Sequence, residues 1–304
     1  MTDSLSPRPR VAAVCVLYGS PQAPQILLDL ADRDVEVVIV DNSSDLEDVA
    51  SLEQSSANLR VVTPGRNLGY SRGVNAAVGA LRDRPDALLV VNPDIVGDAD
   101  ALIGFAGEVA ASPGPVLAAP TGGNGSFGFL TSAPAWLVVG QYAARTSWHP
   151  APRGEQDRFL SGALLGINRA ALELIAPNGE LLVPELFFMD DVELTDRARR
   201  HGAQVVELPT DGELAHVGGT SMRRRPAVRI YFSRVSKVRY WQARSPWAGR
   251  VLRGFFLVES AVGRAVAGRS APDGSAAHGF AATTRWLARA DPSIDDEVLG
   301  NNDA

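Results

Sequence analysis

Apolar, β-prone runs alternate with helix-like segments over the first third of the chain, and this alternation constrains the fold more than any other feature. The runs are VAAVCVLY (11–18), VEVVIVDNSS (35–44), LRVVTPG (59–65) and ALLVVNPDI (87–95). Their continuous apolar character is typical of strands that are buried on both faces. Segments with helical spacing lie between and after them, at 25–32, 67–83 and 98–111. This order predicts an α/β fold with a mostly parallel, Rossmann-like central sheet flanked by helices.

The rest of the chain continues this pattern and then changes character. Strand-like runs recur at 116–120 and 203–209, whereas 121–158 shows no regular periodicity. From Pro226 to Arg269 the pattern is helical, basic and aromatic. We therefore expect four parts, namely a disordered leader (1–10), an α/β domain (11–220), a basic helical extension (221–290) and a disordered tail (291–304).

Charge is distributed unevenly along the 304 residues, whose formal net charge is −6. Twelve Lys or Arg residues lie between Ser221 and Arg269, against the single acid Glu259. The acidic remainder gives no reason to expect a nucleic-acid partner. Two readings of the basic segment stay open, a solvated face of a packed helix and a peripheral contact with an anionic membrane.

Three sequence features bear on the compartment. The N-terminal MTDSLSPRPR has no apolar signal-peptide core, and no run reaches the ~20 apolar residues of a membrane span. Cys15 is the single cysteine, so no intrachain disulfide can form, which fits a reducing compartment. We expect a cytoplasmic protein, located at the inner face of the plasma membrane if the basic segment binds lipid.

Polar residues follow three of the predicted strands where each strand ends. They are Asp41 and Asn42, Arg66 and Asn67, and Asn92 and Asp94. In open α/β sheets, ligands bind in the crevice outside these ends. The turn after the first strand, YGSPQAPQ, has one glycine, so it supplies neither a dinucleotide fingerprint nor the Gly-rich loop of a sugar nucleotidylyltransferase.

Two residues are candidate ligands of a divalent metal. Asp94 lies just beyond a buried strand, where a carboxylate can bind Mg²⁺ or Mn²⁺ shared with a substrate phosphate. His216, in AHVGGTS, offers an imidazole that suits Mn²⁺. The alternatives are a plain Asn-Pro-Asp turn and a structural histidine.

The stretch FFMDDVELTDRARR (187–200) places three acids at the start of a predicted helix. Asp190 and Glu193 have the spacing of a capping box, with Asp190 as the N-cap and Glu193 reaching back. Asp191 then has no structural role that the sequence requires. A carboxylate at a helix N-terminus that faces a cleft can act as a general base.

Taken in order, these motifs resemble the family 2 glycosyltransferases, inverting enzymes of the GT-A fold. The resemblance is closest to the bacterial rhamnosyltransferase-like branch that builds cell-surface polysaccharides. It is carried by VVIVDNSS, RNLGYSRGVN, VVNPDI, FLSGALLGINRAAL with FFMDDVEL, and AHVGG, which together span residues 11 to about 220. The acidic motif departs from the usual EDVDL, and Asn92 replaces the first acid of the metal motif.

The resemblance implies a role for each matched residue. Asp191 would be the catalytic base, and Asp94 with His216 would bind Mg²⁺ or Mn²⁺. The implied nucleotide-sugar contacts are Leu17, Tyr18, Asp41, Arg66, Asn67, Gly69, Asn75 and Asn92. Ser161, Gly162 and Asp190 would line the acceptor side.

The resemblance also implies the partners. The donor would be a dTDP- or UDP-sugar, and the acceptor a glycan, a lipid-linked glycan or a small natural product. The alternative is a non-catalytic homologue that binds a nucleotide-sugar and uses DDVEL as a helix cap. The region 121–158 matches nothing in the family pattern, which leaves the choice of acceptor open.

Overall fold

A seven-stranded sheet forms the centre of the protein. The computed structural model describes residues 9–121, 127–128, 158–212, 214–217, 225–270 and 275–300. The strand order is β10-β6-β9-β4-β1-β2-β3. The strands are β1 (Val11–Leu17), β2 (Glu36–Asp41), β3 (Leu59–Val62), β4 (Ala87–Val91), β6 (Val116–Pro120), β9 (Leu164–Asn168) and β10 (Gln204–Leu208). Only β9 runs antiparallel to its neighbours, so the predicted mostly parallel α/β sheet is confirmed.

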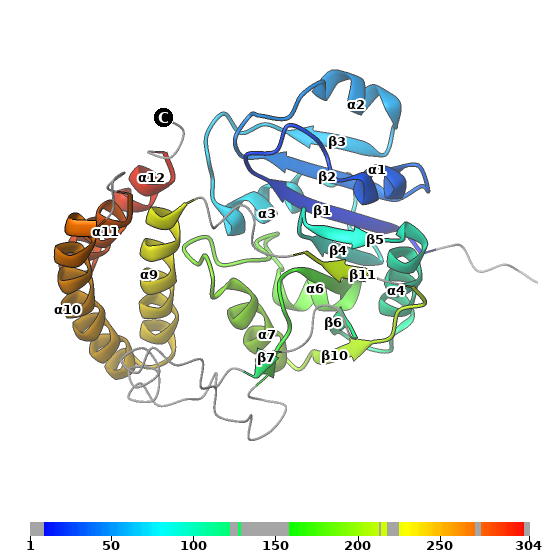
Figure 1. The fold of residues 1–304 in the computed structure, drawn as a ribbon. Coiled ribbons are helices and arrows are strands. Elements are labelled where there is room, and N and C mark those ends of the chain that lie inside the picture. Colours follow the sequence, from blue (N-terminus) through cyan, green and yellow to red (C-terminus); the bar gives the residue numbers. More distant parts are fainter. Residues whose placement is uncertain are drawn as a thin grey trace, which may run out of the picture.

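Helices cover both faces of this sheet, which explains why its central strands are continuously apolar (Figure 1). Alternate side chains of β1 point to opposite faces. One face packs against α1 (Gln25–Ala31) and α4 (Ala99–Ala111). The other packs against α3 (Tyr70–Gly79), α6 (Arg169–Ile175) and α7 (Asp190–Arg200). A further helix, α2 (Val49–Ser55), lies beside β3.

Two short antiparallel pairs lie outside the main sheet. β7 (Phe127–Gly128) pairs with β8 (Arg158–Phe159), and β5 (Ile95–Gly97) pairs with β11 (Leu214–His216). These strands are too short to show a periodicity in the sequence. The second pair matters for the site, because it brings His216 beside the residues that follow β4.

The C-terminal part is helical, as predicted. It contains α9 (Pro226–Arg244), α10 (Pro246–Ser270), α11 (Ser275–Arg289) and α12 (Ser293–Gly300). Figure 1 shows α9 facing the α/β body and α10 at the outer edge of the molecule. Among the helices that the structure describes, none has the length and apolar character that crossing a membrane requires.

The expectation of a disordered tail over 291–304 is wrong for α12. Ile294, Val298 and Leu299 are buried, and the Asp295 carboxylate accepts a 2.6 Å hydrogen bond from the Tyr231 hydroxyl. Docking on α9 thus stabilises a short acidic helix that would be unstable alone. The predicted leader falls mostly on residues 1–8, outside the described part, as do residues 301–304 and most of 121–158.

Candidate active site

The loops at the carboxyl edge of the sheet are held together by Asn42, which follows β2. Its Nδ2 donates to the Gly69 carbonyl at 3.0 Å, and its Oδ1 accepts from the Leu68 amide at 3.3 Å. Gly69 has a φ of 76°, a left-handed conformation that favours glycine. The strand-end pattern pointed to Asn42, although the resemblance assigned it no role.

The Tyr70 hydroxyl connects three segments of the site. It lies 3.0 Å from Asn92 Oδ1, after β4, and 3.3 Å from the Gly162 carbonyl, before β9. Burial raises the pKa of Tyr70 well above its usual range, and the charges of Asp190 and Asp191 add to the shift. The hydroxyl therefore keeps its proton and acts as a donor. Tyr70 was missed as a site residue, although it stands inside the motif RNLGYSRGVN.

Asp191 lies in the first turn of α7 and faces the same edge. Its Oδ1 accepts from the Val192 amide at 2.8 Å, and its Oδ2 from the Gly162 amide at 3.3 Å. A Cβ on Gly162 would lie 3.3 Å from the Asp191 Cβ, so glycine permits this close approach. Burial, and next the charge of Asp190, raise the pKa of Asp191 to about 7. A carboxyl group that ionises near neutral pH suits proton transfer.

The capping box expected at the start of α7 is wrong. Met189 is the N-cap residue, and Asp190 is already helical, with Oδ1 accepting from the Phe188 amide at 2.9 Å. Glu193 does not reach back, because its carboxylate accepts from Arg197 Nε at 3.1 Å one turn later. Asp190 is thus a buried acid beside Asp191, and burial raises its pKa.

Asp94 and His216 meet where β5 pairs with β11. Asp94 Oδ1 lies 3.1 Å from His216 Nε2. That oxygen is buried and has no well-oriented hydrogen-bond donor among the described residues, so it is available to a cation. The described chain contains no cluster of three His, Cys, Asp or Glu side chains around a metal position. Any ion here would therefore need further oxygen ligands from substrate or water.

The predicted nucleotide-sugar contacts near the ends of β1 and β2 are Leu17, Tyr18 and Asp41. Each of them already packs against or bonds to other groups of the protein. Both Asp41 carboxylate oxygens accept backbone bonds within the following loop, from Ser43 at 3.1 Å and Leu46 at 2.9 Å. Leu17 is fully buried in the core. The Arg225 guanidinium stacks on the Tyr18 ring, with its Cζ 3.2 Å from the centroid. These contacts leave Asp41 as a residue that shapes its loop.

Three other predicted nucleotide-sugar contacts form hydrogen bonds or ion pairs with parts of the protein other than Asp190 and Asp191. They are Arg66, Asn67 and Asn75. Arg66 is exposed, with Nη1 3.7 Å from Asp296 Oδ2 on α12. Asn67 holds its own loop by accepting from the Gly69 amide at 2.9 Å. Asn75 exchanges two hydrogen bonds with the Leu182 backbone, of 2.7 and 2.9 Å, which ties α3 to the segment before α7.

The predicted acceptor-side segment adjoins the metal motif. Ser161 Oγ accepts from the Ala163 amide at 3.4 Å, and the Ala163 carbonyl accepts from the Asn92 amide at 2.8 Å. Because β9 runs antiparallel to β4, the start of one strand meets the end of the other. The structure thus brings together Asn92, Ser161, Gly162 and Asp191, with Tyr70 between them.

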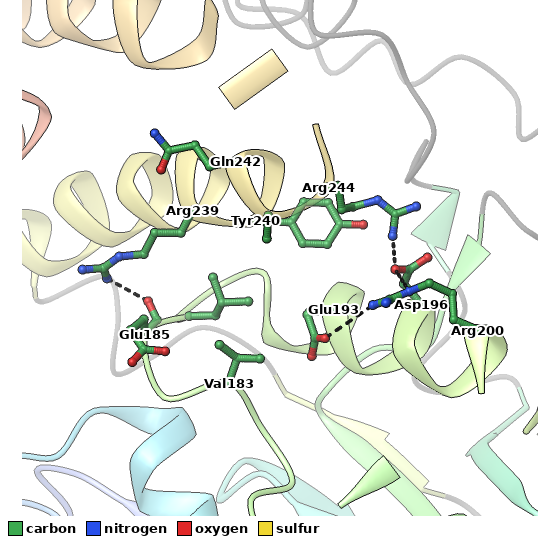
Figure 2. A pocket seen from close by; sticks show the side chains of 11 residues that line it. Val183, Glu185, Glu193, Asp196, Arg200, Arg239, Tyr240, Gln242 and Arg244 are labelled. Carbon is green, nitrogen blue, oxygen red and sulfur yellow. Dashed lines mark hydrogen bonds and ion pairs between the residues drawn. The ribbon is translucent and has the colours of Figure 1, made fainter. Parts of the chain in front are cut away.

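A cavity with a volume of about 640 Å³ lies elsewhere, between α7 and α9 (Figure 2). Several of its charged side chains form ion pairs with one another. Asp196 binds Arg244 and Arg200, and Arg200 lies 3.9 Å from Glu193. The ion pair between Asp196 and Arg244 joins α7 to α9 across this cavity.

Two adjacent acids, a buried carboxylate oxygen without a well-oriented donor and glycine-bearing loops lie at the carboxyl edge of a mostly parallel α/β sheet, an arrangement compatible with a glycosyltransferase. The sequence comparison agrees. The chain is 27% identical to the N-acetylglucosaminyl-diphospho-decaprenol L-rhamnosyltransferase of Mycobacterium tuberculosis, in strains H37Rv and CDC 1551, over 87% of this chain and 96% of the relative. This relationship confirms the resemblance to rhamnosyltransferase-like glycosyltransferases. No protein-family model matches the chain.

Solved structures with similar folds include two sugar-transfer proteins. The mannosyltransferase PcManGT from Pyrobaculum calidifontis, in complex with GDP-Man and Mn²⁺, is 15% identical, with a TM-score of 0.47 over 92% of this chain and 88% of that chain. Mannosyl-3-phosphoglycerate synthase from Rubrobacter xylanophilus is 15% identical, with a TM-score of 0.43 over 78% of this chain and 75% of that chain.

Proposed function

We propose that this protein is an inverting glycosyltransferase. It would move a sugar, rhamnose or another hexose or deoxyhexose, from a nucleotide-diphosphate sugar to an acceptor hydroxyl. The observation that carries the proposal is Asp191, a half-buried carboxylate at the sheet edge whose pKa is raised to about 7. Near neutral pH it can accept the proton of an attacking hydroxyl and so increase its nucleophilicity. One displacement on the opposite face of the sugar then inverts the anomeric centre.

The residues around Asp191 support this assignment. The Gly162 and Val192 amides bond to its two oxygens and fix its orientation. Asp190 provides a like charge that makes the Asp191 carboxylate a stronger base. Ser161, Gly162 and Asp190 would line the acceptor side.

A divalent metal fits the pair formed by Asp94 and His216. Asp94 Oδ1 is buried with no well-oriented donor, and His216 Nε2 lies 3.1 Å away. Oxygen and imidazole ligands suit Mn²⁺, and Mg²⁺ accepts the oxygen ligands. When bound, such an ion stabilises the negative charge on a leaving diphosphate. Asn92 carries no charge, so fewer anionic groups would face the ion than in an acid-rich metal motif.

The name of the mycobacterial relative supports a choice of transferred sugar and acceptor. Its name specifies an L-rhamnosyl group and a diphospho-decaprenol acceptor that carries N-acetylglucosamine. A dTDP- or UDP-sugar donor and a lipid-linked acceptor of cell-wall polysaccharide assembly are therefore our first choice. Asp41, Asn67 and Gly69 would shape the nucleotide pocket through their loops. A free glycan and a small natural product stay open as acceptors.

The test is the transfer of rhamnose from dTDP-rhamnose to N-acetylglucosaminyl-diphospho-decaprenol by the Asp191→Asn variant. Asparagine cannot accept the proton, so we expect kcat to fall about 100- to 10,000-fold while donor affinity changes little. Asp100→Asn is the matched control, because Asp100 also lies in the first turn of a helix but is exposed and paired with Arg33. It should retain native turnover.

Two outcomes would overturn the proposal. Near-native turnover by a folded Asp191→Asn variant would exclude Asp191 as the base. A native chain that binds nucleotide-sugars in calorimetry but transfers no sugar to glycan, lipid-linked or small-molecule acceptors would be a non-catalytic binding protein.

A further inference from the structure

The outer face of α10 carries an apolar stripe. Its members are Trp247, Gly254, Val258, Val262 and Ala265, which recur at intervals of three, four or seven residues and so share one helical face. Trp247 is 63%, Val258 66% and Val262 58% exposed. The opposite face of α10 is buried through Leu252 and Phe256. A long row of exposed apolar side chains on a folded protein marks a contact surface.

Basic residues flank this stripe on one side. Arg250 and Arg264 are exposed and lie next to it on the helix surface. The one acid of α9 and α10 is Glu259, whose Oε1 lies 2.6 Å from Arg234 Nη2. The charge of Glu259 is therefore compensated within the protein. An apolar stripe with a cationic edge is the pattern of a helix that lies in a membrane interface.

We propose that the outer face of α10 binds an anionic lipid membrane peripherally. The valines would enter the acyl boundary, and the two arginines would contact acidic headgroups. Trp247, at the start of the helix, suits the headgroup level, where tryptophan is enriched. A two-fold contact that packed two copies of α10 antiparallel through this face would oppose arginine to arginine, which disfavours that pairing. Figure 1 shows that α10 is at the outer edge of the molecule, so the face can approach a flat surface.

The test is co-sedimentation of the full-length protein with vesicles, in the absence of donor and acceptor. We expect binding to vesicles of phosphatidylcholine mixed with phosphatidylglycerol, weaker binding to phosphatidylcholine alone, and loss at high salt. Val258→Asp should weaken binding at least about tenfold, and the Arg250→Ser, Arg264→Ser double variant by a similar factor. Gln54→Glu is the control, because it adds an acid on an exposed position of α2. It should bind like the native protein.

Tryptophan fluorescence gives a second reading of the same contact. The emission should shift to the blue on anionic vesicles, and Trp247→Phe should remove the shift while binding remains. The proposal is overturned if native protein ignores anionic vesicles, or if Val258→Asp binds them normally. It is also overturned if the native protein is a dimer in solution that does not bind vesicles, and Val258→Asp converts this dimer to a monomer. The stripe would then be an interface between copies. Because these experiments contain no sugar substrate, their outcome does not depend on whether the protein has the proposed transferase activity.

Discussion

Asp190 and Asp191 are adjacent acids with different surroundings. Asp190 is 7% exposed and its Oδ1 accepts from the Phe188 amide, so it belongs to the turn that enters α7. Asp191 is half-buried, and its Oδ2 accepts from the Gly162 amide at the edge of the sheet. Loss of hydration raises the pKa of both carboxyl groups, and the charge of Asp190 raises the pKa of Asp191 further. Asp190 therefore helps to set the basicity of Asp191, the proposed base.

This coupling predicts the pH dependence of transfer. Asp191 acts as a base only when ionised, so kcat/KM should fall as the pH drops through about 7, with unit slope. Asp190→Asn removes a like charge and lowers the pKa of Asp191, so the acid limb should move to lower pH. Rates measured between about pH 5.5 and 9 would show the shift, with Asp100→Asn unchanged. An acid limb that stays in place in a folded Asp190→Asn variant would exclude the coupling.

At the scale of elements, the sequence predicts those helices and strands whose formation depends on a local pattern of apolar and polar residues. The strands at 11–18 and 87–95 are visible because helices cover both sheet faces, which requires unbroken apolar runs. The candidate base and metal residues are visible because they follow strands or open a helix. By contrast, α12 depends on Asp295 meeting Tyr231, a pairing 64 residues apart. The spacing of Asp190 and Glu193 predicts a capping box, yet the Glu193 carboxylate accepts a hydrogen bond from Arg197 instead.

α12 adds a function that no local pattern reveals, since it supports the loop that precedes α3. Asp296 lies 3.1 Å from Arg72 and 3.7 Å from Arg66, and the Leu299 carbonyl accepts from Asn67 Nδ2 at 3.4 Å. A Cβ on Gly69 would lie 3.4 Å from Leu299 Cδ1. The C-terminal helix thus packs directly on the loop that we assign to the nucleotide pocket.

Leu299→Ala should therefore weaken donor binding. The ion pairs of Asp296 are exposed and contribute little, so the buried leucine is the sharper probe. We expect the donor KM to rise several-fold with kcat largely kept, and a loss of roughly 2–4 kcal/mol of stability. Glu297→Gln is the control, because Glu297 pairs with Arg285 on α11 and not with the loop. A donor KM that is unchanged in Leu299→Ala would mean that α12 stabilises the fold without shaping the pocket.

At the scale of the whole molecule, α7 belongs to two cores. Leu194 and Ala198 pack in the core beneath the sheet. Met189 and Val192, on either side of the two acids, pack instead with α9 to α12. Asp196 also binds Arg244 at the end of α9 (Figure 2). The segment that carries the proposed base is thus held jointly by the sheet and by the C-terminal helices.

The boundary expected at residue 220 therefore separates two sequence patterns, and we propose that the parts on either side unfold together. Phe256→Ala tests this, because Phe256 is fully buried in the C-terminal core and far along the chain from the acids. Truncating it should cost about 3–5 kcal/mol and lower the single calorimetric transition as a whole. The near-UV signal and transfer activity should be lost at the same lowered temperature. Val258→Ala, on the exposed face of the same helix, should leave the transition within a degree or so. If Phe256→Ala instead unfolds in two transitions, the later one at the native temperature, then the sheet folds independently of α9 to α12. The position of the proposed base would then not depend on these helices.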